Sequence, residues 1–109
     1  MVATRVVADV LIPGRGDPIE RGTVVMEHGA IAYAGPTDRA PSPSPDERVV
    51  EAPAVLPGLW DCHTHFVGME LSNLEVLATL DLVDAAARAV DDAGKVLDGG
   101  ITSVRDVGG

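Results

Sequence analysis

Residues 57–65 read Pro-Gly-Leu-Trp-Asp-Cys-His-Thr-His, and this run says more about the chain than any other segment. The apolar residues 54–56 lead into it, which predicts a β-strand. Side chains alternate between the two faces of a strand, so His63 and His65 should point the same way, together with Asp61. Two imidazoles that converge on one point suit a metal ion, because imidazole is a common ligand of zinc and neighbouring metals.

A His-x-His pair alone is weak evidence for a metal site, since paired histidines are often hydrogen-bonded surface or core residues. The neighbouring Cys62 should face away from the histidines. We interpret it as a small buried hydrophobic residue rather than as a nucleophile. More than the pair itself is therefore needed to support metal binding.

A second motif, Gly-Ile-Thr-Ser-Val-Arg-Asp-Val-Gly-Gly, occupies residues 100–109 and predicts another strand. Between the two motifs, residues 81–97 show helical periodicity and end at Gly99-Gly100. The periodicity predicts one buried stripe, formed by Leu82, Val83, Ala86, Val90, Ala93 and Leu97. Ser72 and Glu75 have capping-box spacing, which predicts a short helix before it. The expected order is β-α-β.

The first 56 residues are rich in short strand signals. Apolar or β-branched runs at residues 4–12, 23–27, 30–34 and 49–50 predict strands, and His28-Gly29 predicts a tight hairpin turn. Four prolines between residues 35 and 46 predict a surface loop. We therefore expect a small antiparallel sheet.

The two motifs resemble the amidohydrolase superfamily, whose first barrel strand carries Pro-Gly, two apolar residues and Asp-x-His-x-His. The second motif is similar to the second barrel strand of its imidazolonepropionase-like and Xaa-Pro dipeptidase-like branch. The resemblance implies an α/β fold: residues 1–56 form part of a small β-sandwich, and residues 57–109 form the first β-α-β unit of a (β/α)8 TIM-like barrel. Such a barrel needs about 250 residues, so we expect this chain to be either the N-terminal portion of a larger enzyme or one piece of a split or cleaved enzyme.

The resemblance also implies site residues. His63 and His65 are the expected ligands of one or two divalent metal ions, with zinc the first expectation. The other ligands, a carboxylated lysine, two histidines and an aspartate, and the catalytic base would come from outside this chain. Lys95 is the only lysine and belongs to the predicted helix, so it does not fit that role. No catalytic residue is assigned within residues 1–109.

Three further polar residues have two interpretations each. Asp61 either approaches the metal or, as we favour, accepts hydrogen bonds that orient its neighbours. Arg105 and Asp106 end the second strand, where unpaired charge is costly. They either form a structural ion pair or hydrogen-bond network, which we favour, or lie near substrate.

The implied function is hydrolysis of a C–N bond, in a peptide-like or cyclic amide, by metal-activated water. One alternative is a deaminase or phosphotriester hydrolase of the same superfamily. Another is a non-catalytic β-rich interaction module with a vestigial barrel remnant. The expected partners are a small-molecule or dipeptide-like substrate and the remainder of the enzyme, and homo-oligomerisation is left open.

The amino-acid composition limits the possible partners and the cellular compartment. The chain contains eight Lys and Arg residues and 17 Asp and Glu residues, so its net charge is −9. This negative charge argues against nucleic acids and anionic membranes as partners. The single cysteine provides no disulfide framework. The chain shows neither a signal-peptide pattern nor an apolar run of about 20 residues. We expect a cytoplasmic protein.

Overall fold

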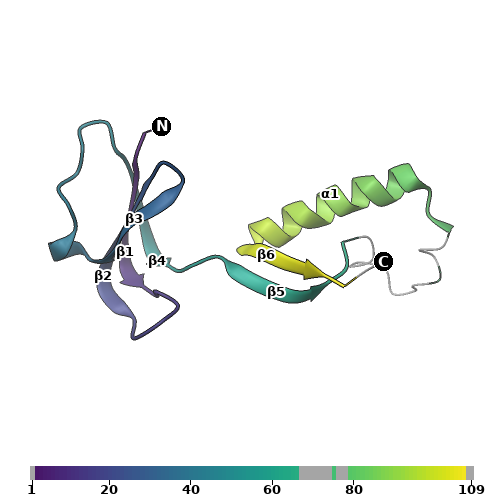
Figure 1. The fold of residues 1–109 in the computed structure, drawn as a ribbon, viewed down its shortest axis with the longest axis horizontal. Helices are drawn as coiled ribbons and strands as arrows, with labels where there is room; N and C mark the ends of the chain where they lie inside the picture. The colour runs from purple at the N-terminus through teal and green to yellow at the C-terminus, as the bar shows by residue number, and fades with distance from the viewer. Residues whose placement is uncertain (1, 67–74, 76–78, 108–109) are drawn as a thin grey trace. The chain divides into compact units, whose positions relative to one another are not determined.

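The computed structural model describes residues 2–66, 75 and 79–107 (Figure 1). Its elements are β1 (Thr4–Leu11), β2 (Ile19–Glu27), β3 (Ala30–Pro36), the 3-10 helix η1 (Thr37–Arg39), β4 (Arg48–Val55), β5 (Leu59–Thr64), α1 (Leu82–Asp98) and β6 (Ile101–Asp106). The chain divides into two compact units, Met1–Pro57 and Gly58–Gly109. The identity of these units as sandwich and barrel segments stays a prediction.

The first unit is a four-stranded sheet with the strand order β3-β2-β1-β4. Strands β1, β2 and β3 pair antiparallel, as expected, but β4 pairs parallel with β1 over Thr4↔Arg48 to Leu11↔Val55. The prediction of a wholly antiparallel sheet is therefore wrong for β4. The physical reason is the proline-rich connection after β3, which is long enough to return the chain to the opposite edge of the sheet.

The hairpin between β2 and β3 follows the prediction. Glu27 pairs with Ala30, so the loop has two residues, His28 and Gly29. Both have positive φ, 52° and 79°. Two positive φ values define a type I′ turn, whose twist matches that of the flanking strands.

The core of the first unit lies where β1 and β2 meet. Its buried apolar side chains are Ala8, Leu11, Val24 and Val25. Gly22 is required there, because a Cβ at this position would overlap the Cβ of Leu11. The strand register pairs Gly22 with Ala8 of β1, and close packing against Leu11 explains why no side chain is present.

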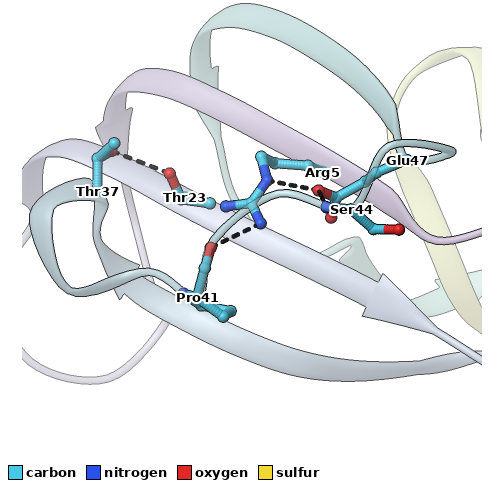
Figure 2. Close-up of polar contacts among 6 residues, drawn as sticks. All are labelled: Arg5, Thr23, Thr37, Pro41, Ser44 and Glu47. Atoms are coloured by element: carbon cyan, nitrogen blue, oxygen red, sulfur yellow. Dashed lines mark hydrogen bonds and ion pairs between the residues drawn. The ribbon is translucent and has the colours of Figure 1, made fainter.

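A buried ion pair fastens the loop between β3 and β4 to this sheet (Figure 2). Arg5 Nε donates to Glu47 Oε2 at 2.9 Å, and the two side chains are 9% and 2% exposed. Arg5 Nη2 also donates to the carbonyl oxygen of Pro41 at 2.9 Å, and the Ser44 amide donates to Glu47 Oε2 at 3.3 Å. One buried guanidinium thus organises a loop that has few apolar residues of its own.

The second unit has the predicted β-α-β order, with β5 and β6 paired parallel (Figure 1). Asp81 caps α1 by accepting a hydrogen bond from the Val83 amide at 2.9 Å. The helix ends at Gly99, and Gly100 has a φ of 83°. The predicted stop at the glycine pair is confirmed, whereas the helix expected from Ser72 falls largely on residues outside those described.

The predicted buried stripe of α1 is wrong. The buried residues of the helix are Asp92 and Val96, flanked by half-buried Ala85 and Ala89. The large members of the predicted stripe are exposed instead: Leu82 by 82%, Val83 by 75%, Val90 by 75% and Leu97 by 61%. The helix carries two neighbouring apolar faces, and a layer of two strands covers only one. No helix in the described part of the chain is both long and apolar enough to cross a membrane.

Candidate metal centre

The two histidines lie at the carboxyl end of β5. His63 belongs to the strand and His65 follows its last residue. Their ring centroids are 5.3 Å apart with an interplanar angle of 67°, and both residues are exposed. The expected convergence of the rings is therefore present. Because β5 and β6 are parallel, the charged residues that end β6 lie at the same edge of this two-stranded sheet.

The pairing of β5 with β6 contains two irregularities. The paired positions are Leu59↔Ile101, Trp60↔Ser103, Asp61↔Val104 and Thr64↔Asp106. Thr102 is therefore an extra residue in β6, and one extra residue follows Asp61 in β5. The extra residue in β5 compensates for the extra residue in β6, so the last pair, Thr64↔Asp106, has the same register as the first pair, Leu59↔Ile101.

The first irregularity depends on Gly58. A Cβ at this position would lie 2.7 Å from the Cβ of Thr102 and would overlap both γ atoms of that side chain. The adjoining Leu59 amide donates to the carbonyl oxygen of Gly100 at 2.9 Å. The extra residue of β6 thus fits only because Gly58 has no side chain. The Pro-Gly of the motif is the sequence signal for this contact, but nothing in the sequence identifies Thr102 as its partner.

The second irregularity is bridged by Asp61. Its Oδ1 accepts a hydrogen bond from the backbone amide of His63 at 3.0 Å. From the neighbouring strand, Asp106 Oδ2 lies 3.5 Å from the Phe66 amide, which donates to it. The Val107 amide donates to the Thr64 carbonyl oxygen at 3.1 Å. Hydrogen bonds from the backbone to Asp61, to Asp106 and to the neighbouring strand therefore fix the chain on both sides of the histidines.

The remaining residues considered in the sequence, Arg105, Lys95 and Cys62, are all exposed. Arg105 is exposed, and no ion pair joins it to Asp106 among the described residues. Lys95 lies on α1 and its Nζ is 2.8 Å from Asp91 Oδ2, as expected of a helix-surface residue. Cys62 is exposed. The prediction that it is buried is wrong, because two strands leave its side of β5 uncovered.

The described residues supply an incomplete set of ligands for a metal ion. Within the described ranges, no group of three or more His, Cys, Asp or Glu side chains is arranged to hold one. Two imidazoles on one tetrahedral zinc, with each nitrogen about 2.0–2.1 Å from the metal, have ring centroids roughly 5 Å apart. The observed 5.3 Å between His63 and His65 matches that value. The pair fits two corners of a metal site and needs further ligands.

Known proteins provide an independent comparison. No protein-family model matches the chain. Ochratoxinase of Aspergillus niger is 32% identical over 110 residues, a match that spans 97% of this chain and 23% of that protein. Imidazolonepropionase of Rhizorhabdus wittichii is 44% identical over 50 residues, which cover 45% of this chain and 12% of that protein.

Solved structures agree with the sequence matches. The crystal structure of A. niger ochratoxinase superposes with a TM-score of 0.83 at 30% identity, over 97% of this chain and 26% of that one. The crystal structure of an amidohydrolase gives 0.82 at 29% identity, over 99% and 26%. The chain belongs to the amidohydrolase superfamily. A prolidase crystallised with N-methylphosphonate-L-proline also matches, with a TM-score of 0.77 at 30% identity over 96% of this chain and 26% of that one.

Membership of the superfamily confirms the resemblance drawn from the two motifs. The chain spans about a quarter or less of the length of these relatives, matching 23% of ochratoxinase and 12% of imidazolonepropionase by sequence. It is an amino-terminal portion of the superfamily fold, with a mixed α/β structure made mostly of strands.

Proposed function

We propose that residues 1–109 form the amino-terminal portion of a metal-dependent amidohydrolase that hydrolyses a C–N bond in a peptide-like or cyclic amide substrate. The observation that carries the proposal is the convergence of the His63 and His65 rings at 5.3 Å on the superfamily's first motif. Relatives named ochratoxinase, imidazolonepropionase and prolidase support a hydrolytic reaction.

In this proposal His63 and His65 hold a divalent metal ion, with zinc as the first candidate. A bound zinc lowers the pKa of its water to about 7 and polarises the scissile carbonyl. Both histidines bind through neutral imidazole, and their exposure leaves room for ligands from the remainder of the enzyme. Those ligands and the catalytic base lie outside residues 1–109, so this chain alone is inactive.

The fold supports the same proposal. Catalytic groups of (β/α)8 barrels sit at the carboxyl ends of the strands. His63 and His65 end β5, and Arg105 and Asp106 end the parallel β6. We therefore take β5, α1 and β6 as the start of a barrel and the sheet of residues 1–56 as part of a β-sandwich. Because Arg105 is exposed at this edge, we propose that it lies near the substrate, and that Asp106 supports the backbone beside the histidines.

The test uses the complete protein. His63→Ala and His65→Ala should each remove much of the bound metal and nearly all hydrolysis of peptide-like and cyclic amide substrates. Metal content by elemental analysis and product formation by chromatography are the measurements. Cys62→Ser is the matched control, since it changes an exposed neighbour on the same strand and should leave both quantities near wild type.

Unchanged metal content in both histidine variants would remove the basis of the proposal. A loss of metal with Cys62→Ser as large as with the histidine variants would mean that the strand presents its other face to the metal.

A further inference from the structure

We propose that Asp61 is a positioning residue for the histidine pair and that it acts through one hydrogen-bond acceptor oxygen rather than through its charge. This inference rests on the proposed function, because it assumes that His63 and His65 hold a metal ion. It goes further in assigning a specific atom, Oδ1 of Asp61, and a specific target, the backbone amide of His63.

The first step is the register of the strand pair. Between Asp61 and Thr64, β5 advances three residues while β6 advances two, from Val104 to Asp106. One residue of β5 therefore has no partner across the ladder. Such a bulge disrupts the ladder locally, and its unpaired N–H groups need another acceptor.

Asp61 supplies that acceptor from within the strand. Its Oδ1 is 3.0 Å from the His63 nitrogen, a normal hydrogen-bond length. Asp61 is half-buried, whereas the amide that it caps belongs to an exposed residue. The side chain and the irregular backbone thus form one local unit that spans Asp61 to His63.

This unit controls where the imidazoles point. A shift of one residue in a strand sends every following side chain to the opposite face. The bulge lies between Asp61 and Thr64 of β5, so His63 lies within it. If the amide lost its acceptor, the bulge could relax, and the His63 ring would move away from its present place 5.3 Å from the His65 ring.

The contacts of Asp61 favour acceptor geometry over charge. The described part of the chain contains no ion pair that includes Asp61. An asparagine offers the same carbonyl-type acceptor oxygen without a negative charge. A carboxylate that bound metal directly, or moved a proton, would need its charge, so the asparagine variant separates these roles.

The experiment compares wild type, Asp61→Asn and Asp61→Ala in the complete protein, with Cys62→Ser as the control from the same bulge. The zinc dissociation constant is measured by competition with a chromophoric chelator, and folding is checked by the thermal midpoint of each metal-free variant. Asp61→Asn and Cys62→Ser should bind zinc about as tightly as wild type. Asp61→Ala should bind about 10–100-fold more weakly, the usual effect of losing a residue that orients a ligand.

Two results would overturn the inference. Zinc binding by Asp61→Asn that is as weak as that of Asp61→Ala would show that the carboxylate charge is needed. Wild-type binding by Asp61→Ala would show that the hydrogen bond has no positioning role. If Asp61→Ala does not fold, Asp61→Asn is compared with wild type alone: equal zinc affinity supports the acceptor role, and a loss of about 10-fold or more overturns it.

Failure of this inference is distinguishable from failure of the proposed function. If His63→Ala and His65→Ala lose zinc while the Asp61 variants depart from the expected order, only the positioning role falls. If both histidine variants keep zinc, the proposed function falls, and the positioning role falls with it.

Discussion

Replacing Gly58 by alanine should destabilise the β5–β6 unit, because the added methyl group has no space. An ideal Cβ at Gly58 would lie 2.7 Å from the Cβ of Thr102 and would overlap both of its γ atoms. Carbon atoms in good contact are about 3.5–4.0 Å apart. All three threonine atoms sit at or next to the β carbon, so a change of rotamer cannot clear the overlap and the backbone must move.

The size of the effect follows from this overlap. Forcing a methyl group into a packed site costs about 1–3 kcal/mol. Gly94→Ala is the matched control, since it makes the same chemical change inside α1, where nothing lies within 4 Å of the added Cβ. Alanine is more favourable than glycine in a helix by about 1 kcal/mol. The two substitutions should therefore change the free energy of unfolding in opposite directions.

Chemical denaturation of the complete protein measures both changes. The double variant Gly58→Ala/Thr102→Gly tests the mechanism, because it removes every threonine atom that the new methyl group would meet. It should recover part of the stability lost in Gly58→Ala. A Gly58→Ala protein as stable as wild type, or a double variant less stable than Gly58→Ala, would refute the steric argument.

Two further predictions concern the rest of the chain. Glu47→Ala should lower the free energy of unfolding by about 3–5 kcal/mol, since it leaves the buried Arg5 guanidinium without its ion-pair partner. The control is Asp46→Ala, which changes an exposed neighbouring residue and should alter the free energy of unfolding by no more than about 0.5 kcal/mol. A loss below about 1 kcal/mol for Glu47→Ala would contradict a stabilising role of the ion pair. Residues 1–109 expressed alone should be unfolded, molten or aggregated, because Leu59, Val83 and Val90 remain 48%, 75% and 75% exposed. Circular dichroism during heating is the measurement, and a sharp cooperative transition of a soluble monomer would favour an independent module.

Local features of the fold were predictable from the sequence. The turn at His28-Gly29 follows from two residues that tolerate positive φ, and the end of α1 follows from Gly99-Gly100. The convergence of His63 and His65 follows from strand alternation at the end of β5. Each of these depends on neighbours within a few residues.

Features that depend on distant partners were not predictable. The parallel pairing of β4 depends on which sheet edge the chain reaches after its proline-rich loop. Arg5 and Glu47 are 42 residues apart, and nothing in either segment points to the other. Periodicity identified α1 but could not choose between its two apolar faces, because that choice depends on the narrow layer that β5 and β6 provide.

The structure also explains why the full motif is more informative than its histidines. Gly58 admits the extra residue of β6, and Asp61 bridges the extra residue of β5. Each irregularity changes the register by one residue, and only the two together return the strands to their original pairing. A His-x-His pair without the glycine and the aspartate would have the same nitrogen donors on a differently paired strand. Gly58 and Asp61 therefore fix how β5 pairs with β6, and strand alternation brings the two imidazoles to one face.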